Sequence, residues 1–168
     1  MTYSGQELNL LLKTVLNIYL FIIIINSNLS MHKVLIVIGL PGSGKSTLAK
    51  KLEGYIIFDD FITTFFNGAV ISELKTQNKI CLIDPRLCIP DIFNRYMDAI
   101  LNYVQKEDIH LILFENDKDN CLNNIKLRDD KRKGIQNQIY KYSEIYSTDF
   151  YNGWDFEVLK VWSSNSTS

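Results

Sequence analysis

The residues best suited to chemistry lie in the glycine-rich stretch "GLPGSGKST" at positions 39–47. Gly39 and Gly44 are followed by Lys45 and Ser46 in the spacing G-x-x-x-x-G-K-[ST]. Glycines let a backbone curve closely with its N–H groups pointing inward, and a helix that begins there adds a partial positive charge. These are the requirements of a phosphate-binding loop. In this pattern the lysine reaches the β- and γ-phosphates of a nucleoside triphosphate, and the hydroxyl holds Mg²⁺.

The surroundings of this stretch favour a real loop over a chance match. The β-branched run "KVLIVI" precedes it, and a segment with helical spacing of its leucines follows it. We therefore expect a site for ATP and Mg²⁺ here. The residues expected to bind the nucleotide are Gly39, Leu40, Pro41, Gly42, Ser43, Gly44, Lys45, Ser46 and Thr47.

Acidic residues follow two further apolar runs. Asp84 comes after "KICLI", where we expect it to orient Mg²⁺ or its water close to Ser46; the alternative is a turn residue before Pro85. Asp59 and Asp60 come after "YIIF". Adjacent strand residues point to opposite sides, so we expect one of this pair to face the site as a general base, and we favour Asp60. Its alternative role is to cap a helix that begins after it.

Basic residues could neutralise the charge that develops during phosphoryl transfer. In "KLRDDKRKG" (126–134), Arg128 and Arg132 are four apart, which predicts that they share one helix face, and Gly134 is a candidate hinge. The alternative is an ordinary charged helix surface. Arg86 and Arg95 follow the third apolar run and could hold a phosphate of the acceptor, or be plain surface charges.

The elements that must position these residues alternate along the chain. Such a β–α series predicts an α/β protein with a parallel sheet of about five strands and helices on both faces, a three-layer P-loop nucleoside-triphosphate hydrolase fold. The expected strands are 33–38, 55–58, 79–83, 109–114 and 156–162, and the expected helices are 44–53, 90–105, one that ends at about 133, and 135–146.

Composition narrows the class of protein. The chain has 168 residues, 46% of them hydrophobic, which is enough for one domain with a core. A net charge of −1 gives no overall field that would attract nucleic acid or lipid. Cys81, Cys88 and Cys121 form no C-x-x-C pair, which disfavours a disulfide framework or a zinc site and indicates a reducing compartment such as the cytoplasm. The two histidines, His32 and His110, are interpreted as strand-edge residues.

From Met31 to about Trp162 the sequence resembles the small P-loop kinases of the polynucleotide-kinase type, which occur in bacteriophages and large viruses. The resemblance rests on "GLPGSGKST", "IIFDDF", "LIDPRLC" and "LILFENDKDNCLNNIKLRDDKRK". It implies that Asp60 or Asp59 activates a hydroxyl, that Arg128 lies near the adenine or the phosphates, and that Arg132 stabilises the transferring group. The arginine that usually follows the base is missing, so the acceptor stays open between a small molecule and a nucleic-acid 5′ end.

These observations divide the chain into three parts. Residues 31–162 are the expected kinase domain, and 163–168 ("SSNSTS") are an expected disordered tail. Residues 1–30 are apolar but interrupted by Lys13 and Asn17. Three interpretations of residues 1–30 stay open: they precede the true translation start at Met31, they form a membrane anchor, or they form a helix that packs on the domain.

Two other function classes compete with a kinase. A GTPase needs D-x-x-G, which is absent, and N-K-x-D, which "NDKD" (116–119) does not match. A nucleotide-binding module without turnover, tethered to a membrane through 1–30, is the second.

The sequence carries no strong signal for a protein partner. Its many Ile, Asn, Lys and Tyr residues are typical of A+T-rich coding sequences, which points to a viral or parasitic genome.

Overall fold

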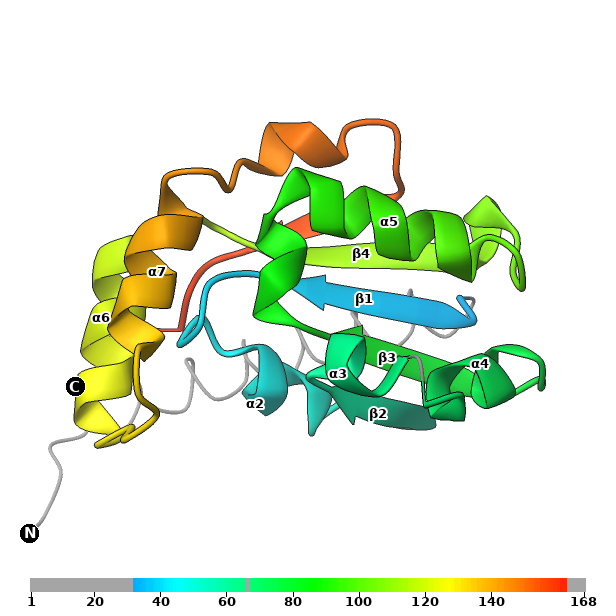
Figure 1. Cartoon of the computed structure of the whole chain (residues 1–168), viewed down its shortest axis with the longest axis horizontal. Helices are drawn as coiled ribbons and strands as arrows, with labels where there is room; N and C mark the ends of the chain where they lie inside the picture. Colours follow the sequence, from blue (N-terminus) through cyan, green and yellow to red (C-terminus); the bar gives the residue numbers. More distant parts are fainter. Residues whose placement is uncertain (1–31, 66, 163–168) are drawn as a thin grey trace, which may run out of the picture.

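A computed structural model of the protein describes residues 32–65 and 67–162. The expected N-terminal extension (1–30) and the expected tail (163–168) lie outside the described residues. Within the described ranges the strands form one five-stranded parallel sheet in the order β2-β3-β1-β4-β5 (Figure 1). The strands are β1 (Val34–Ile38), β2 (Tyr55–Asp59), β3 (Lys79–Ile83), β4 (Ile109–Phe114) and β5 (Phe156–Leu159).

The apolar runs of the sequence explain which strands are central. Every residue of β1 and of β4 is buried, as expected for parallel strands covered on both faces. β2 lies at one edge of the sheet, and only part of its surface is covered. The prediction of a parallel α/β sheet of about five strands is therefore confirmed.

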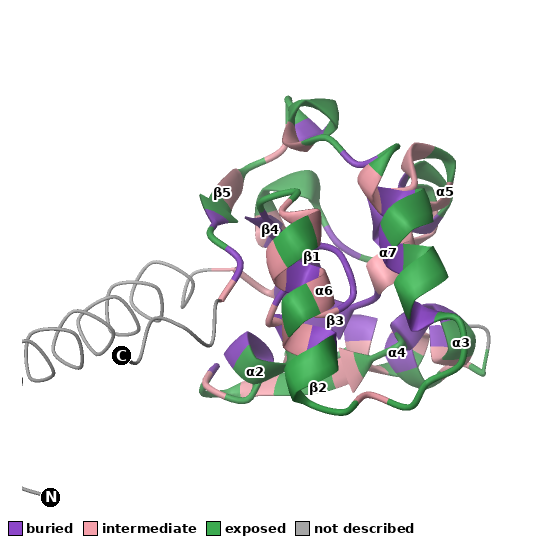
Figure 2. Cartoon of the chain, turned by 90° about the vertical axis from the view of Figure 1, so that its left-hand side faces the viewer, coloured by how far each residue is buried: buried purple, intermediate pink, exposed green. Residues whose placement is uncertain are grey.

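Helices cover one face of the sheet with a large apolar core. α5 is amphipathic, because its buried side chains recur at helical spacing: Phe93, Tyr96, Met97 and Ile100. In Figure 2 the buried residues of the helices face the strands, while exposed residues cover the outside. The helices that contribute to this core are α3 (Phe61–Phe65), α4 (Ala69–Leu74), α5 (Pro90–Ile100), α6 (Lys118–Leu127) and α7 (Ile135–Ser143).

The short helix α2 (Lys45–Ala49) lies on the opposite face, so helices occupy both sides. Leu48 and Ala49 pack in a second core with Leu35 and Val37 of β1. The cysteines Cys81, Cys88 and Cys121 are buried free thiols, and burial raises the pKa of each to about 12.

The strand order places several loops at one edge. β1 lies between β3 and β4. The strand order therefore reverses at β1, and the loops that follow neighbouring strands separate at its carboxyl end. In open α/β sheets, ligands bind at such a switch point. Because all strands are parallel, the loops after β1, β2 and β3 meet there.

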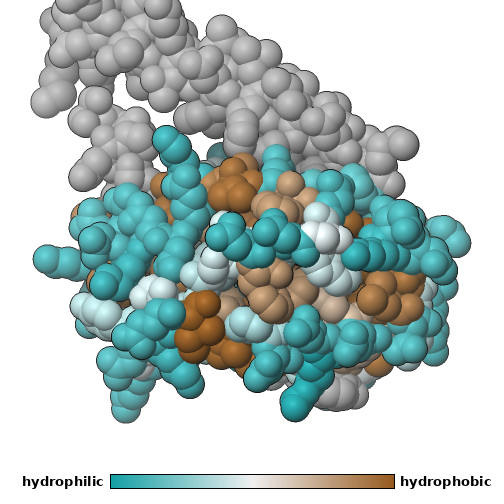
Figure 3. Space-filling view, turned by 90° about the horizontal axis from the view of Figure 1, so that it is seen from above, coloured by the Kyte–Doolittle hydropathy of each residue, from teal (hydrophilic) through white to brown (hydrophobic). Residues whose placement is uncertain are grey.

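The surface of the described residues is mostly polar. Seen from above, hydrophilic side chains separate several small hydrophobic patches (Figure 3). Between residues 32 and 162, none of the described helices combines the length and the apolar character that crossing a membrane requires.

Candidate active site

A cavity of about 430 Å³ opens at the carboxyl edge of the sheet. This volume lies in the range of about 300–1,000 Å³ that is typical of small-molecule sites. Its walls come from the loops after β1, β2 and β3, from α3 and α7, and from the segment between α6 and α7. The residues that line it are Pro41, Gly42, Gly44, Lys45, Ser46, Thr47, Asp59, Asp60, Thr63, Pro85, Arg86, Arg128, Arg132, Lys133, Ile135, Gln138 and Tyr142.

The glycine loop has a backbone shape that needs glycine. Gly42 and Gly44 have φ angles of 87° and 111°, in the left-handed region that other residues rarely adopt. A Cβ atom on Gly42 would lie 2.6 Å from the carbonyl oxygen of Cys121 in α6. In the same place Asn124 Nδ2 donates a hydrogen bond to the Gly42 carbonyl at 2.9 Å. Helix α6 therefore fixes the loop, which the loop sequence alone does not reveal.

We expect Gly42→Ala to lower the free energy of unfolding more than the matched substitution Gly54→Ala. Both positions have positive φ, which costs about 1–2 kcal/mol for a residue with a Cβ. A Cβ at Gly54 would meet no atom within 4 Å, whereas at Gly42 it would overlap a backbone oxygen. We therefore expect the free energy of unfolding, measured by urea denaturation, to fall by about 3 kcal/mol in Gly42→Ala and by about 1 kcal/mol in Gly54→Ala. Equal losses would contradict the close approach of α6.

Lys45 lies beneath the loop with its ammonium group turned inward. The residue is only 6% exposed, and Nζ donates to the carbonyl oxygens of Gly39 at 2.7 Å and Leu40 at 2.8 Å. Burial lowers the pKa of this ammonium. A phosphate nearby would favour the protonated, positively charged form of the Lys45 side chain. The position therefore suits a lysine that neutralises phosphate.

Ser46 at the start of α2 is paired with Asp59. Its Oγ donates to Asp59 Oδ2 at 2.7 Å, and the backbone N–H of Asp60 donates to Asp59 Oδ1 at 3.1 Å. We had expected only one of the two aspartates to face the site, and this prediction is wrong, because both line the cavity. Asp60 has a φ of 52°, and this left-handed turn at the end of β2 breaks the alternation of strand side chains.

Asp84 takes a different position from the predicted one. It is fully buried and absent from the cavity lining, and Ser46 is hydrogen-bonded to Asp59 instead. Asp84 Oδ2 accepts from the backbone N–H of Ile62, in the first turn of α3, at 3.2 Å. Oδ1 accepts from the backbone N–H of Arg86 at 2.9 Å, at the start of the 3₁₀ helix η1 (Pro85–Cys88). The capping role considered for Asp60 thus belongs to Asp84.

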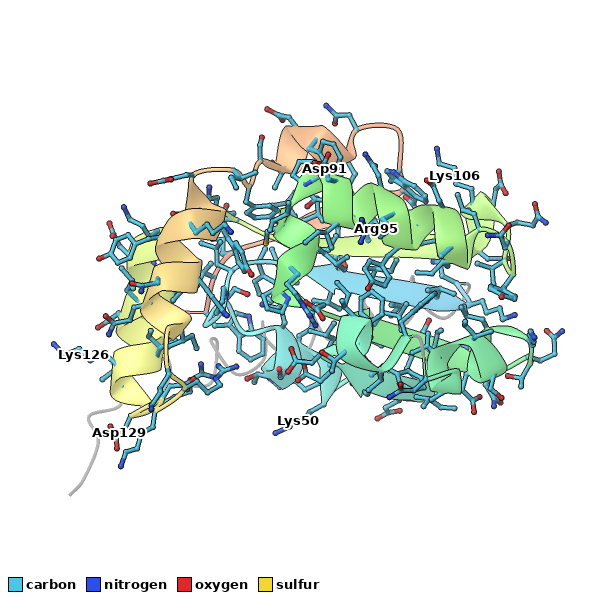
Figure 4. All side chains as sticks on the ribbon, in the orientation of Figure 1. Lys50, Asp91, Arg95, Lys106, Lys126 and Asp129 are labelled. Carbon is cyan, nitrogen blue, oxygen red and sulfur yellow. The ribbon has the colours of Figure 1, made fainter. Side chains whose placement is uncertain are left out.

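The carboxylate of Asp84 also fixes the side chain of Arg86. Arg86 Nε donates to Oδ1 at 2.8 Å and a terminal nitrogen, Nη2, donates to Oδ2 at 2.6 Å, a two-pronged pair that raises the pKa of the guanidinium. Nη2 also donates to Thr63 Oγ1 of α3 at 3.0 Å. Arg86 thereby lines the cavity in a defined position. Arg95, the other predicted acceptor residue, is an exposed side chain on α5 and does not line the cavity (Figure 4).

Arg128 and Arg132 both reach the cavity, but not from one helix face. α6 ends at Leu127, and Asp129 turns the chain with a φ of 49°. The prediction of a shared helix face is therefore wrong. Instead, Asp130 brings the two arginines together.

Asp130 accepts hydrogen bonds from both guanidinium groups. Arg132 donates to it at 2.7 and 3.0 Å, and Arg128 donates at 3.5 Å. The hydrogen bond from Arg132 lowers the pKa of Asp130 to about 2. The segment then enters α7 through Gly134, whose φ of 77° makes it the left-handed N-cap.

Sequence reasoning missed several cavity residues. Thr63 lies in α3, and Gln138 and Tyr142 lie four apart in α7, so that they share one helix face. This spacing was readable from the sequence, but polar residues on one helix face are common. Asn124 was missed because its role depends on a contact with the glycine loop, 82 residues earlier in the chain.

Comparison with known proteins adds a viral relative. No family model matches the sequence. The chain is 40% identical over 134 residues to a protein of Acanthamoeba polyphaga mimivirus described as uncharacterized protein R277. The match covers 77% of this chain and 97% of that protein. The chain therefore belongs to the same protein family as this mimivirus protein.

Proposed function

We propose that the protein is a P-loop kinase of the polynucleotide-kinase-like type. It transfers the γ-phosphate of ATP to a hydroxyl or phosphate of a nucleoside, a nucleotide or a polynucleotide 5′ end. One observation carries the proposal. A single cavity brings together a glycine loop with its lysine, a serine paired with an aspartate, a second aspartate and three arginines.

The loop fits a polyphosphate. Its left-handed glycines let the backbone curve closely, and the buried ammonium of Lys45 lies under the loop. Ser46 and Asp59 are the residues that would hold Mg²⁺, the hydroxyl as a ligand and the carboxylate as its orienting partner. When bound, Mg²⁺ neutralises charge on the phosphate oxygens.

The three aspartates near the site have different roles in this proposal. Asp59 is bonded to Ser46 and belongs to the metal side. Asp84 is buried and neutralised by Arg86. Asp60 lines the cavity beside Asp59, which makes it the group that accepts the proton of the acceptor hydroxyl at a carboxylate oxygen.

Of the three arginines, Arg86 is held in place by hydrogen bonds, whereas Arg128 and Arg132 are more exposed. Arg86 is held by Asp84 and by Thr63, three residues after Asp60, so it belongs to the acceptor side. Arg128 and Arg132 have side chains that are 55% and 63% exposed, on the segment between α6 and α7. These two are suited to stabilising the charge on the transferring phosphoryl group.

A direct assay tests the proposal. Purified protein is incubated with γ-labelled ATP and Mg²⁺, with and without a nucleoside, a nucleoside monophosphate or an oligonucleotide with a 5′-hydroxyl. We expect at least one acceptor to increase ADP release and to carry the label. ATP binding without ADP release would support a binding module instead. Release of labelled inorganic phosphate, unaffected by every acceptor, would support a hydrolase.

A further inference from the structure

A second group of reactive side chains lies at the opposite edge of the sheet, at the amino-terminal ends of the strands. His32 precedes β1, His110 is the second residue of β4, and Asp155 and Glu157 lie at the beginning of β5. β4 is paired with both β1 and β5, so these four residues come from adjacent strands. The group is separated from the candidate active site by the length of the strands.

One carboxylate oxygen faces two imidazole rings. Asp155 Oδ2 lies 2.8 Å from His110 Nδ1 and 3.2 Å from His32 Nε2. The ring centroids are 5.0 Å apart, and the ring planes are tilted by 32°. On the far side of His110, Nε2 lies 3.9 Å from Glu157 Oε1.

Three other polar atoms of this group have no partner in the described part of the protein. His110 is only 9% exposed, and three buried atoms have no hydrogen-bond partner among the described residues: His32 Nδ1, His110 Nε2 and Glu157 Oε1. Buried polar atoms normally have partners, so the simple ion pairs with Asp155 do not account for the whole group. The side chain of Asp155 is 62% exposed, which leaves a route from solvent.

We propose that His32 Nε2, His110 Nδ1 and Asp155 Oδ2 bind a divalent transition metal ion of the Zn²⁺ class. Tetrahedral Zn²⁺ with bonds of about 2.0–2.1 Å places its ligand atoms about 3.4 Å apart. The donor atoms of the three residues lie within 4.8 Å of one another, and two spacings are already 2.8 and 3.2 Å. The three atoms are therefore close enough to share one ion once the side chains adjust to its bond lengths.

The arrangement around His110 accommodates a metal ion. A neutral His110 that donates from Nδ1 to Asp155 has only a lone pair at Nε2, which then faces the acceptor Glu157 Oε1. A metal ion takes the lone pairs of both rings. Binding through Nδ1 then turns His110 Nε2 into a donor toward Glu157, the usual carboxylate that orients a metal-bound histidine.

The choice of metal follows from the ligands. Imidazole nitrogen suits Zn²⁺, Cu²⁺, Ni²⁺ and Fe²⁺, whereas Mg²⁺ prefers an all-oxygen site. A bound ion would join the edge strand β5 to β4 and β1. The inference does not depend on the proposed kinase activity, because it concerns different residues at the other end of the sheet.

Zinc binding to the full chain tests the inference. The protein is stripped with a chelator, and Zn²⁺ is titrated by calorimetry and counted by mass spectrometry. We expect one tightly bound Zn²⁺ per chain. Asp155→Asn and His110→Asn should weaken binding about 100-fold or more, and Glu157→Gln about 10- to 100-fold. The control Glu107→Gln, at an exposed residue just before β4, should leave binding unchanged.

Two further measurements keep the test decisive. Far-ultraviolet circular dichroism checks that each variant folds, and Glu157→Gln, which keeps all three ligands, serves if a ligand variant does not. Substitution with Co²⁺ should give visible bands of a nitrogen and oxygen site. The inference fails if the wild type binds no Zn²⁺ at micromolar concentration. It fails equally if the site variants bind like the wild type, or if Co²⁺ shows the bands of a thiolate site.

Discussion

Replacing Lys45 by alanine is expected to reduce kcat/KM for phosphoryl transfer by about 10³-fold or more. The ammonium group lies under the glycine loop, held by the carbonyl oxygens of Gly39 and Leu40, and in the proposed function its positive charge neutralises the phosphates. The measurement is the rate of label transfer to the best acceptor. Lys50→Ala, at an exposed residue just after α2, is the matched control and should keep normal activity (Figure 4).

The alternative for Lys45 is a purely structural role in the loop. Because its hydrogen bonds hold two loop carbonyls, Lys45→Ala should also be compared with the wild type in urea denaturation. A folded variant that retains more than about a tenth of the wild-type rate would contradict the electrostatic role. Lys45→Arg keeps the charge but not the compact shape of the ammonium, so we expect it to restore little activity.

Replacing Asp60 by asparagine is expected to slow transfer by about 10²- to 10⁴-fold while ATP affinity stays within a few-fold of the wild type. The substitution keeps the size of the side chain and removes the oxygen that takes the proton. Single-turnover kinetics and nucleotide binding by calorimetry measure the two quantities separately. A change in binding alone would argue against a base.

Asp59→Asn is the matched comparison, because the two aspartates are neighbours and both line the cavity. Asp59 orients the Ser46 hydroxyl, so this variant should need a higher Mg²⁺ concentration for half-maximal rate. The two variants therefore differ in their response to added Mg²⁺. If Asp59→Asn loses the chemical step and Asp60→Asn does not, the proton acceptor is Asp59.

Local sequence patterns were sufficient for the parts of the protein that local physics determines. Four strands were predicted because each is a short apolar run, and the fifth because polar and apolar residues alternate in it, although it ends at Leu159 and not at Trp162. The glycine loop was predicted because its spacing has few other uses. Helix ends were less accurate. α5 ends at Ile100 and α6 at Leu127, earlier than expected, because no glycine or proline directly follows either end to mark it in the sequence.

Contacts between distant segments explain what the sequence did not reveal. Asp84 is only two residues from Arg86 in the chain, but its hydrogen bond to Ile62 depends on how α3 packs beside β3. His32 and His110 were interpreted as strand-edge residues, but they lie at the amino-terminal ends of the interior strands β1 and β4. Their proximity follows from the pairing of β1 with β4, which a single sequence does not display.

The last described residue of the chain also touches the glycine loop. The backbone N–H of Trp162 donates to the Ser43 carbonyl at 3.4 Å, and Asn124 joins the carbonyl oxygens of Gly42 and Trp162. During synthesis on a ribosome, the loop emerges more than a hundred residues before this contact can form. Under the proposed function, nucleotide affinity should therefore appear only once Trp162 has left the ribosomal exit tunnel, so nascent chains arrested before that point would be held poorly by immobilised ATP.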